Sequence, residues 1–404
     1  MSYRTLRSLF HDPSEDEAAI YDSRFSDPRT IHLETAIKGF PAFIFMTPEI
    51  YENLIEASRL DKEILKLELA LPERALTNYR NSCLIDEIVI TNEIEGVNST
   101  RREIGQVLER LEKNDRRGRF LGIVQKNALL QTRPDIPLET CGDVRTLYDD
   151  LVLDEVRQAN PDDVPDGQYF RSKIAHVVVQ AGIPLHDGLE PEGRIIEETE
   201  RALALLGYDA IEPLVRIAAF HFLFGYIHPF YDGNGRMSRF ISSYYIAKYF
   251  EPLAGLGVSY AIKENIKKYY KGFSICEHDL NRGDLTPFVI AFTDIIVQAM
   301  RNLRDSLAER KEALKGTLAF IGECIPEKSQ HVAEILATAS LFTFDGIDTD
   351  RLTHEEGVTR QTLSKRLKPL REKGLVTTTK IGRQAFHKLD LDRLEALCKQ
   401  KEVG

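Results

Sequence analysis

Most of the chain repeats apolar and charged positions with the period of an α-helix. From about residue 48 to 131, leucines and isoleucines recur among charges at helical spacing. Thr100 followed by Glu103 has the spacing of a capping box, so a new helix is predicted to start there. Further helices are predicted at about 143–157, from Ile195 onward, and up to residues 269–270. Residues 1–50, with Pro13, Pro28 and Pro41, are predicted to form an irregular arm.

The most apolar stretch, residues 212–226, is apolar nearly all round, which predicts a buried central helix. Pro213 suits the first turn of this helix, and a second helix is predicted at 234–250. Thr286 and Pro287 predict the start of a long helix over about 287–322. Residues 175–185 differ because they are short, β-branched and interrupted by Gly182. They predict a small hairpin.

Residues 329–400 form a separate pattern near the C-terminus. Helices are predicted at 329–338, 348–356 and 359–373, followed by short strands at 375–380 and 385–389. Gly357 lies where a helix-turn-helix needs a tight turn, and the two strands would form a wing. Pro369 is a mild objection, because it should kink or end the third helix. The pattern resembles winged helix-turn-helix domains.

Composition narrows the class of protein only broadly. The 404 residues are 43% hydrophobic and 29% charged, which fits a globular protein of two or three domains. The net charge of −10 argues against a protein that binds nucleic acid over its whole surface. The five cysteines are scattered without a C-x-x-C pair, so reduced thiols are predicted rather than disulfides or zinc ligands. No apolar run is long enough for a membrane helix, so a cytoplasmic protein without membrane contact is predicted.

The strongest chemical signal is HPFYDGNGRMSR, from His228 to Arg239. A glycine-rich turn that opens a helix offers unpaired backbone N–H groups to phosphate, and arginine forks bind phosphate oxygens. The acid Asp232 suits Mg²⁺, and a histidine can act as a general base near neutral pH. Together these residues predict a site that holds a nucleoside triphosphate and deprotonates a nucleophile beside it.

The same residues resemble the signature of the Fic family, HxFx(D/E)GNGRxxR, at all eight specified positions. The resemblance extends over roughly residues 80–300 and includes GQYFRSKIAHVVVQAG, His221 and the pair Tyr269–Tyr270. It implies transfer of AMP from ATP to a Ser, Thr or Tyr hydroxyl of a target protein or of the chain itself. Each motif residue then has an implied role: the general base is His228, the Mg²⁺ ligand is Asp232, the anion hole is Gly233, Asn234 and Gly235, the remaining phosphate ligands are Arg236 and Arg239, and the buried loop anchor is Phe230.

The resemblance also implies a fold and a reaction type. The fold would be mainly α: an N-terminal helical region at 1–130, a Fic catalytic core at 131–325 with a β-hairpin flap, and a winged-helix domain at 326–404. Gly235 favours AMP transfer over the phosphate transfer of Doc-type kinases, which carry a bulkier basic residue there. Other nucleotide donors stay open. Residues 177–185 resemble the flap that pairs with an extended target segment, although an ordinary surface hairpin has the same pattern.

An inhibitory segment is predicted upstream. The sequence TNEIEG at 91–96 matches the family's inhibitory pattern through Thr91, Glu95 and Gly96. Thr91 and Glu95 are four residues apart and share a helix face, within a helix predicted near 84–96. Gly96 would end this helix. By resemblance, Glu95 pairs with Arg239 and takes the space that the ATP γ-phosphate needs, and the same glutamate could instead position water for removal of AMP.

The C-terminal pattern is locally basic, with nine Lys or Arg and one Glu between residues 359 and 388. The predicted DNA contacts on the third helix and the wing are Arg360, Gln361, Ser364, Lys365, Lys380 and Arg383. A protein-contact or dimerisation role for the same face stays open, as does a homodimer. The rival to an enzyme is therefore a DNA-binding regulator whose Fic domain is sensory or idle. The target protein and the activating signal are not legible from the sequence.

Overall fold

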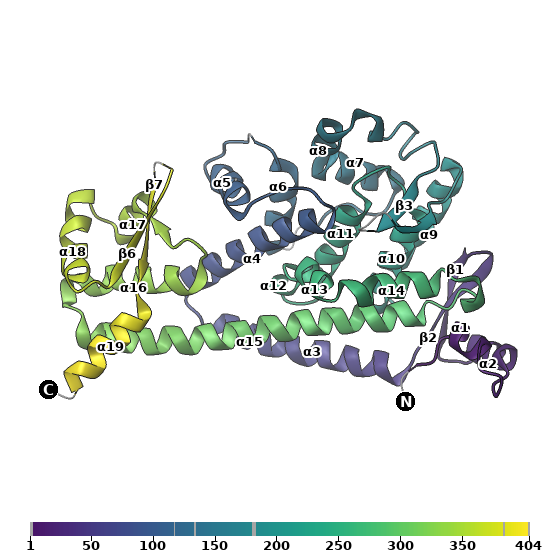
Figure 1. The fold of residues 1–404 in the computed structure, drawn as a ribbon, viewed down its shortest axis with the longest axis horizontal. Helices are drawn as coiled ribbons and strands as arrows, with labels where there is room; N and C mark the ends of the chain where they lie inside the picture. The colour runs from purple at the N-terminus through teal and green to yellow at the C-terminus, as the bar shows by residue number, and fades with distance from the viewer. Residues whose placement is uncertain (1–2, 117, 133–134, 180–182, 383, 403–404) are drawn as a thin grey trace. The chain divides into compact units, whose positions relative to one another are not determined.

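A computed structural model describes residues 3–116, 118–132, 135–179, 183–382 and 384–402 (Figure 1). The chain is mainly helical with small antiparallel sheets, which confirms the predicted fold class. It divides into two compact units. The first comprises Met1–Lys62 and Leu84–Arg301, and the second comprises Glu63–Cys83 and Asn302–Gly404. Three long helices contribute residues to both units: α3 (Pro48–Leu69), α4 (Glu73–Ile94) and α15 (Thr286–Cys324).

The N-terminal arm is ordered, so the prediction of an irregular segment is wrong. It contains α1 (Leu6–Phe10), α2 (Glu17–Phe25) and a hairpin of β1 (Thr30–Ile37) and β2 (Phe40–Phe45). Lys38 and Gly39 both have positive φ, 52° and 85°, the conformation of a tight two-residue hairpin turn. The fully buried Phe43 packs with the helix residues Leu6 and Leu9. Tertiary burial therefore orders a segment whose three prolines had indicated irregular chain.

The first unit continues through a run of helices. They are α3 (Pro48–Leu69), α4 (Glu73–Ile94), α5 (Arg101–Glu112), α6 (Leu121–Leu129), α7 (Cys141–Leu151) and α8 (Leu153–Ala159), with short 3₁₀ turns η1 (Leu130–Thr132) and η2 (Pro161–Asp163). The start of α5 is as predicted, because the Thr100 hydroxyl accepts the Glu103 N–H at 3.2 Å. The predicted hairpin is also confirmed as β3 (His176–Val179) and β4 (Ile183–Asp187), which pair antiparallel. Its turn, residues 180–182, lies outside the described residues.

Two helices form the centre of the first unit. The predicted all-buried helix is α10 (Pro213–Ile227), with Pro213 in its first turn, and the next is α11 (Asn234–Tyr249). The helix α9 (Glu192–Gly207) packs against α10. The remaining elements are α12 (Pro252–Gly255), α13 (Val258–Glu264), α14 (Ile266–Cys276), η3 (Asp279–Asn281) and the start of α15 (Thr286–Cys324). Because α10 and α11 are joined by six residues, the loop between them is held at both ends by core helices.

The second unit carries the predicted C-terminal pattern of helices and strands. Its elements are α16 (Glu327–Phe342), β5 (Ile347–Asp348), α17 (Thr349–Glu356), α18 (Arg360–Glu372), β6 (Val376–Ile381), β7 (Gln384–Leu389) and α19 (Leu391–Glu402). Gly357, with φ 69°, makes the turn between α17 and α18, and α18 continues through Pro369. The sheet order is β5–β7–β6, and β5 was not predicted. Assignment of this unit to the winged-helix class stays a prediction.

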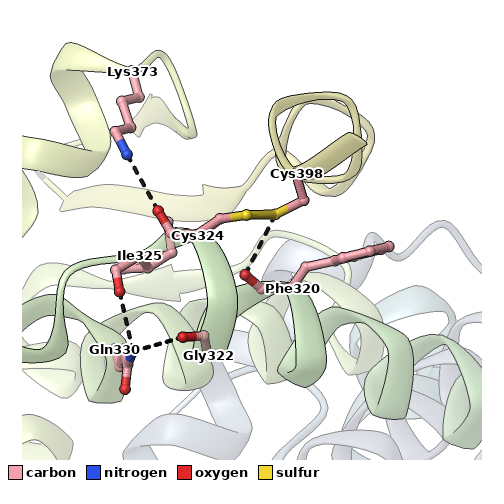
Figure 2. The surroundings of a disulfide bond; sticks show 7 residues. All are labelled: Phe320, Gly322, Cys324, Ile325, Gln330, Lys373 and Cys398. Atoms are coloured by element: carbon pink, nitrogen blue, oxygen red, sulfur yellow. Dashed lines mark hydrogen bonds between the residues drawn. A yellow bond between two sulfur atoms is a disulfide. The ribbon is translucent and has the colours of Figure 1, made fainter. Parts of the chain in front are cut away.

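A disulfide joins Cys324, at the end of α15, to Cys398 in α19, so the prediction that all five cysteines are reduced is wrong (Figure 2). Their Cα atoms are 5.8 Å apart, and 74 residues separate them in sequence. Such a separation gives no local spacing signal, because the two helices meet only in the folded unit. Nearby, the Lys373 ammonium donates to the Cys324 carbonyl at 3.2 Å.

Candidate functional site

The loop from His228 to Gly233 is anchored at both ends. His228 ends α10 in the left-handed conformation, with φ 53° and ψ 63°, and its N–H donates to the Phe224 carbonyl. Phe230 is fully buried and stacks on Tyr148 with ring centroids 3.8 Å apart, as an anchoring role requires. The strained backbone of His228 is therefore held by a helix end on one side and a buried aromatic pair on the other.

Asn234 closes this loop through its side chain. Its Oδ1 accepts the Phe230 N–H at 2.9 Å, and its Nδ2 donates to the Phe230 carbonyl at 2.8 Å. The sequence had grouped Asn234 with the two glycines as a single anion hole. In the structure both polar atoms of its side chain bind the Phe230 backbone and shape the loop.

Gly233 directly precedes α11, and its φ of 88° is in the left-handed region that favours glycine. A Cβ at this position would also lie 3.0 Å from Val152 Cγ2. Asp232 places one carboxylate oxygen 2.6 Å from the Gly233 N–H, which donates to it, and the other 3.3 Å from Arg236 Nη2. The Asp232 side chain is 39% exposed, so it faces solvent from within the loop.

Arg236 and Arg239 are both almost completely buried. Arg236 forms an ion pair with Asp232, and its Nε has no hydrogen-bond partner among the described residues. A buried guanidinium with an unused donor is unusual and favours an anion at this position. The described residues hold no group of three or more His, Cys, Asp or Glu side chains that could bind a metal by themselves.

Arg239 contacts the end of α4. Its Nε donates to Thr91 Oγ1 at 2.7 Å, and its Nη2 donates to Glu95 Oε1 at 2.7 Å and to the Thr91 carbonyl at 3.2 Å. The Glu95 carboxylate lies directly over Gly235, where an added Cβ would collide with it. Gly96 follows with φ 72°. Of the three residues predicted from TNEIEG, Thr91 and Glu95 thus contact the N-terminal part of α11, and Gly96 follows directly after them.

Comparison with known proteins agrees with this geometry. Residues 140–246 match the sequence model of the Fic/DOC family. This part of the chain is similar to a Fic domain. Curated relatives are the proteins named "Protein adenylyltransferase Fic" of Drosophila melanogaster and Drosophila sechellia, each 26% identical over 229 residues. The match covers 54% of this chain and 42% of each relative, so the chain spans less than half of their length.

A solved structure shows the same fold. The crystal structure of a Fic family protein from Desulfovibrio desulfuricans G20 superposes with a TM-score of 0.50 at 19% identity. The superposition covers 85% of this chain and 96% of that one. The similarity therefore extends well beyond the residues that match the family model.

One buried residue of the Fic domain was missed by sequence reasoning. Arg171 is completely inaccessible, and its guanidinium donates to the carbonyls of Lys173, His228 and Leu189 at 2.6, 2.8 and 2.7 Å. The segment that contains it was noted as part of the resemblance, but no residue in it was given a role. A single arginine beside the predicted hairpin carries no sequence signal that separates it from the exposed arginines.

His221 lies beneath the site in the core of the Fic domain. Its Nδ1 is 2.8 Å from the Ser242 hydroxyl and its Nε2 is 2.7 Å from the Tyr269 hydroxyl. Burial, with a smaller effect from Arg239, lowers the pKa of His221 to about 3, so the ring is neutral. It therefore connects α10, α11 and α14 as a hydrogen-bonding group without charge.

In the second unit, the predicted nucleic-acid contacts are surface residues. Arg360, Gln361, Ser364 and Lys365 are exposed on α18, and Lys380 is exposed on β6. Arg360 forms an ion pair with Asp350. Arg383 lies outside the described residues. None of the helices in the described part of the chain is long and apolar enough to cross a membrane.

Proposed function

We propose that this chain is a protein adenylyltransferase that transfers AMP from ATP to a hydroxyl side chain of a target protein or of itself. The observation that carries the proposal is the complete Fic motif on the loop and first turn of α11, with two buried arginines beside a histidine at the end of α10. The name of the Drosophila relatives supports the same reaction class.

The proposed roles follow from the geometry. The target oxygen attacks the α-phosphorus, His228 accepts its proton, and pyrophosphate leaves. The amides of the first turn of α11 and the Arg236 and Arg239 guanidiniums bind the phosphates. Asp232 would hold Mg²⁺, which would offset the charge that develops on transfer. One carboxylate suffices where phosphate oxygens supply further ligands.

Self-inhibition by Glu95 is part of the proposal. Glu95 already accepts a hydrogen bond from Arg239 and covers Gly235, the position that a phosphate group would approach. Two anions cannot share this guanidinium donor and this space, so the carboxylate and the nucleotide compete. Removal of AMP at the same site is the alternative activity of this geometry. It predicts release of AMP from modified target with Mg²⁺ and no ATP.

The test uses ATP labelled at the α-phosphate with wild-type protein, Glu95→Gly, and Glu95→Gly combined with His228→Ala. We expect covalent label in Glu95→Gly, weaker label in wild type and none in the double variant. Label that persists without His228 would refute its role as the base. Absence of label in every variant, with folding intact, would refute the transferase.

A second function, binding of duplex DNA by the second unit, is favoured by the exposed face of α18. Lys365, Lys368 and Arg371 lie at helical spacing on this face, opposite the buried leucines of α18. Phosphate contacts of this kind weaken steeply with salt.

Fluorescence anisotropy with a random duplex at low and moderate salt tests this proposal. We expect salt-dependent binding that is weakened in Lys365→Gln and unchanged in the control Lys328→Gln, an exposed lysine of α16. Binding that does not respond to Lys365, or no binding at low salt, would contradict the DNA role. Sequence-specific binding without any AMP transfer would instead favour the regulator.

A further inference from the structure

Three segments of the first unit meet at the buried side chain of Arg171. Its Nη1 donates to Lys173, which precedes β3, and its Nη2 donates to Leu189, which follows β4. Its Nε donates to the carbonyl of His228, the proposed base. One planar guanidinium therefore connects both ends of the β3–β4 hairpin to His228, the proposed general base.

Backbone dipoles stabilise the charge of Arg171. Among the described residues, the hydrogen bonds of its side chain go to carbonyl oxygens, including Ile227 at 3.5 Å and His228 at the C-terminal end of α10. Carbonyls at a helix C-terminus carry partial negative charge and stabilise a cation. A buried arginine of this kind is costly to remove, because its carbonyl partners would lose their donors without gaining water.

The backbone at Gly188 and Leu189 packs closely against Arg171 and His228. Gly188 donates its N–H to the Ala175 carbonyl, and Leu189 donates to the Ile227 carbonyl at 3.1 Å. A Cβ added at Gly188 would lie 3.0 Å from His228 Cβ and would collide with the Arg171 guanidinium. The chain that leaves the hairpin thus passes between Arg171 and His228 with no room for a side chain.

We propose that Arg171 is a positioning residue that fixes the β3–β4 hairpin relative to His228. The inference rests on the proposed transferase function, in which a target segment lies along the hairpin and presents its hydroxyl to the imidazole. The proposed phosphate-binding groups are the amides and arginines of α11. They are different from the carbonyl groups to which Arg171 donates. Its loss therefore lowers the rate of transfer to protein and leaves ATP binding intact.

The experiment compares Arg171→Gln and Arg171→Lys in the Glu95→Gly background. The control is Arg145→Gln, because Arg145 on α7 donates to the Tyr169 carbonyl at 3.1 Å, two residues before Arg171, and otherwise donates to Asp149 rather than to the His228 carbonyl. We expect Arg171→Gln to lower the transfer rate about 100-fold, as expected for a misplacement of about 1 Å. The ATP dissociation constant should stay near that of the parent, Arg171→Lys should recover part of the rate, and Arg145→Gln should match the parent.

Hydrogen exchange provides a readout without nucleotide. Arg171→Gln should speed exchange of the Gly188 and Leu189 amides, and Arg145→Gln should not. If Glu95→Gly carries no label, the transferase proposal fails, and the exchange result still decides whether Arg171 holds the hairpin. Parent-like transfer and exchange in Arg171→Gln would overturn the inference, as would equal losses of transfer and ATP affinity. If Arg171→Gln does not fold, the same comparison is made with Arg171→Lys and Gly188→Ala.

Discussion

Replacing Glu95 with glycine should tighten ATP binding, and the contact with Arg239 sets the size of the effect. The Arg239 side chain is 2% exposed, the Glu95 side chain is 23% exposed, and their donor and acceptor are 2.7 Å apart. A hydrogen bond to a charged group is worth about 1.5–3 kcal/mol net. Since 1.4 kcal/mol corresponds to a tenfold change, the competing carboxylate should weaken ATP binding by about 10- to 150-fold.

The assay is calorimetric titration with a non-hydrolysable ATP analogue and Mg²⁺, followed by the rate of label transfer. Glu93→Gly is the control, because Glu93 lies two residues earlier, in the last turn of α4, but pairs with Lys263 and has a 58% exposed side chain. It removes one negative charge from the same end of α4 and should leave ATP affinity near the wild-type value. Equal affinities in wild type and Glu95→Gly, or equal gains in both variants, would refute competition at Arg239.

Three further outcomes are expected. Gly235→Ala should abolish AMP transfer even in the Glu95→Gly background while thermal stability is kept, because the methyl group fills the space over the first turn of α11; retained transfer would contradict this. Burial raises the pKa of Glu87 from 4.5 to about 7. The stabilisation from its proton is therefore complete below pH 4.5 and is lost as pH rises through 7, by about 3 kcal/mol. Glu87→Gln should flatten this part of the profile of melting temperature against pH, and an unchanged profile would count against it. Reduction of the Cys324–Cys398 disulfide should destabilise the second unit by about 4 kcal/mol, measured by denaturant unfolding with and without reductant; Cys398→Ser should then be insensitive to reductant.

The sequence predicts the parts of the site that depend on local pattern. The apolar run of α10, the glycine that opens α11 and the spacing of Thr91 and Glu95 are all local features. Each of these patterns determines the conformation of only one or two turns of the chain, so it can be interpreted without knowing the tertiary structure. Contact between Glu95 and Arg239 was predicted only through family resemblance, because 144 residues separate them.

The sequence could not predict contacts that depend on tertiary placement. Nothing in the sequence near Arg171 shows that its carbonyl partners lie at the two ends of the β3–β4 hairpin and at the end of α10. Asn234 is a recognisable position of the motif, but its two hydrogen bonds to the Phe230 backbone depend on the conformation of the loop. Lys38 and Gly39 could have indicated a hairpin turn, but the flanking strands are stabilised by helices elsewhere in the chain.

The geometry of α4 explains how the proposed inhibition could be lifted without unfolding the helix. Glu95 lies just after Ile94, the last residue of α4. One turn earlier, Thr91 contacts Arg239, and two turns earlier the buried Glu87 contacts Ser259. These earlier contacts hold the helix when the Glu95 carboxylate moves. Arg236 makes no contact with Glu95, so one of the two arginines stays available to a phosphate while the other is occupied. Under the proposed function, a nucleotide would bind first at Arg236 and then compete with Glu95 for Arg239, so the inhibition would decrease as the ATP concentration rises.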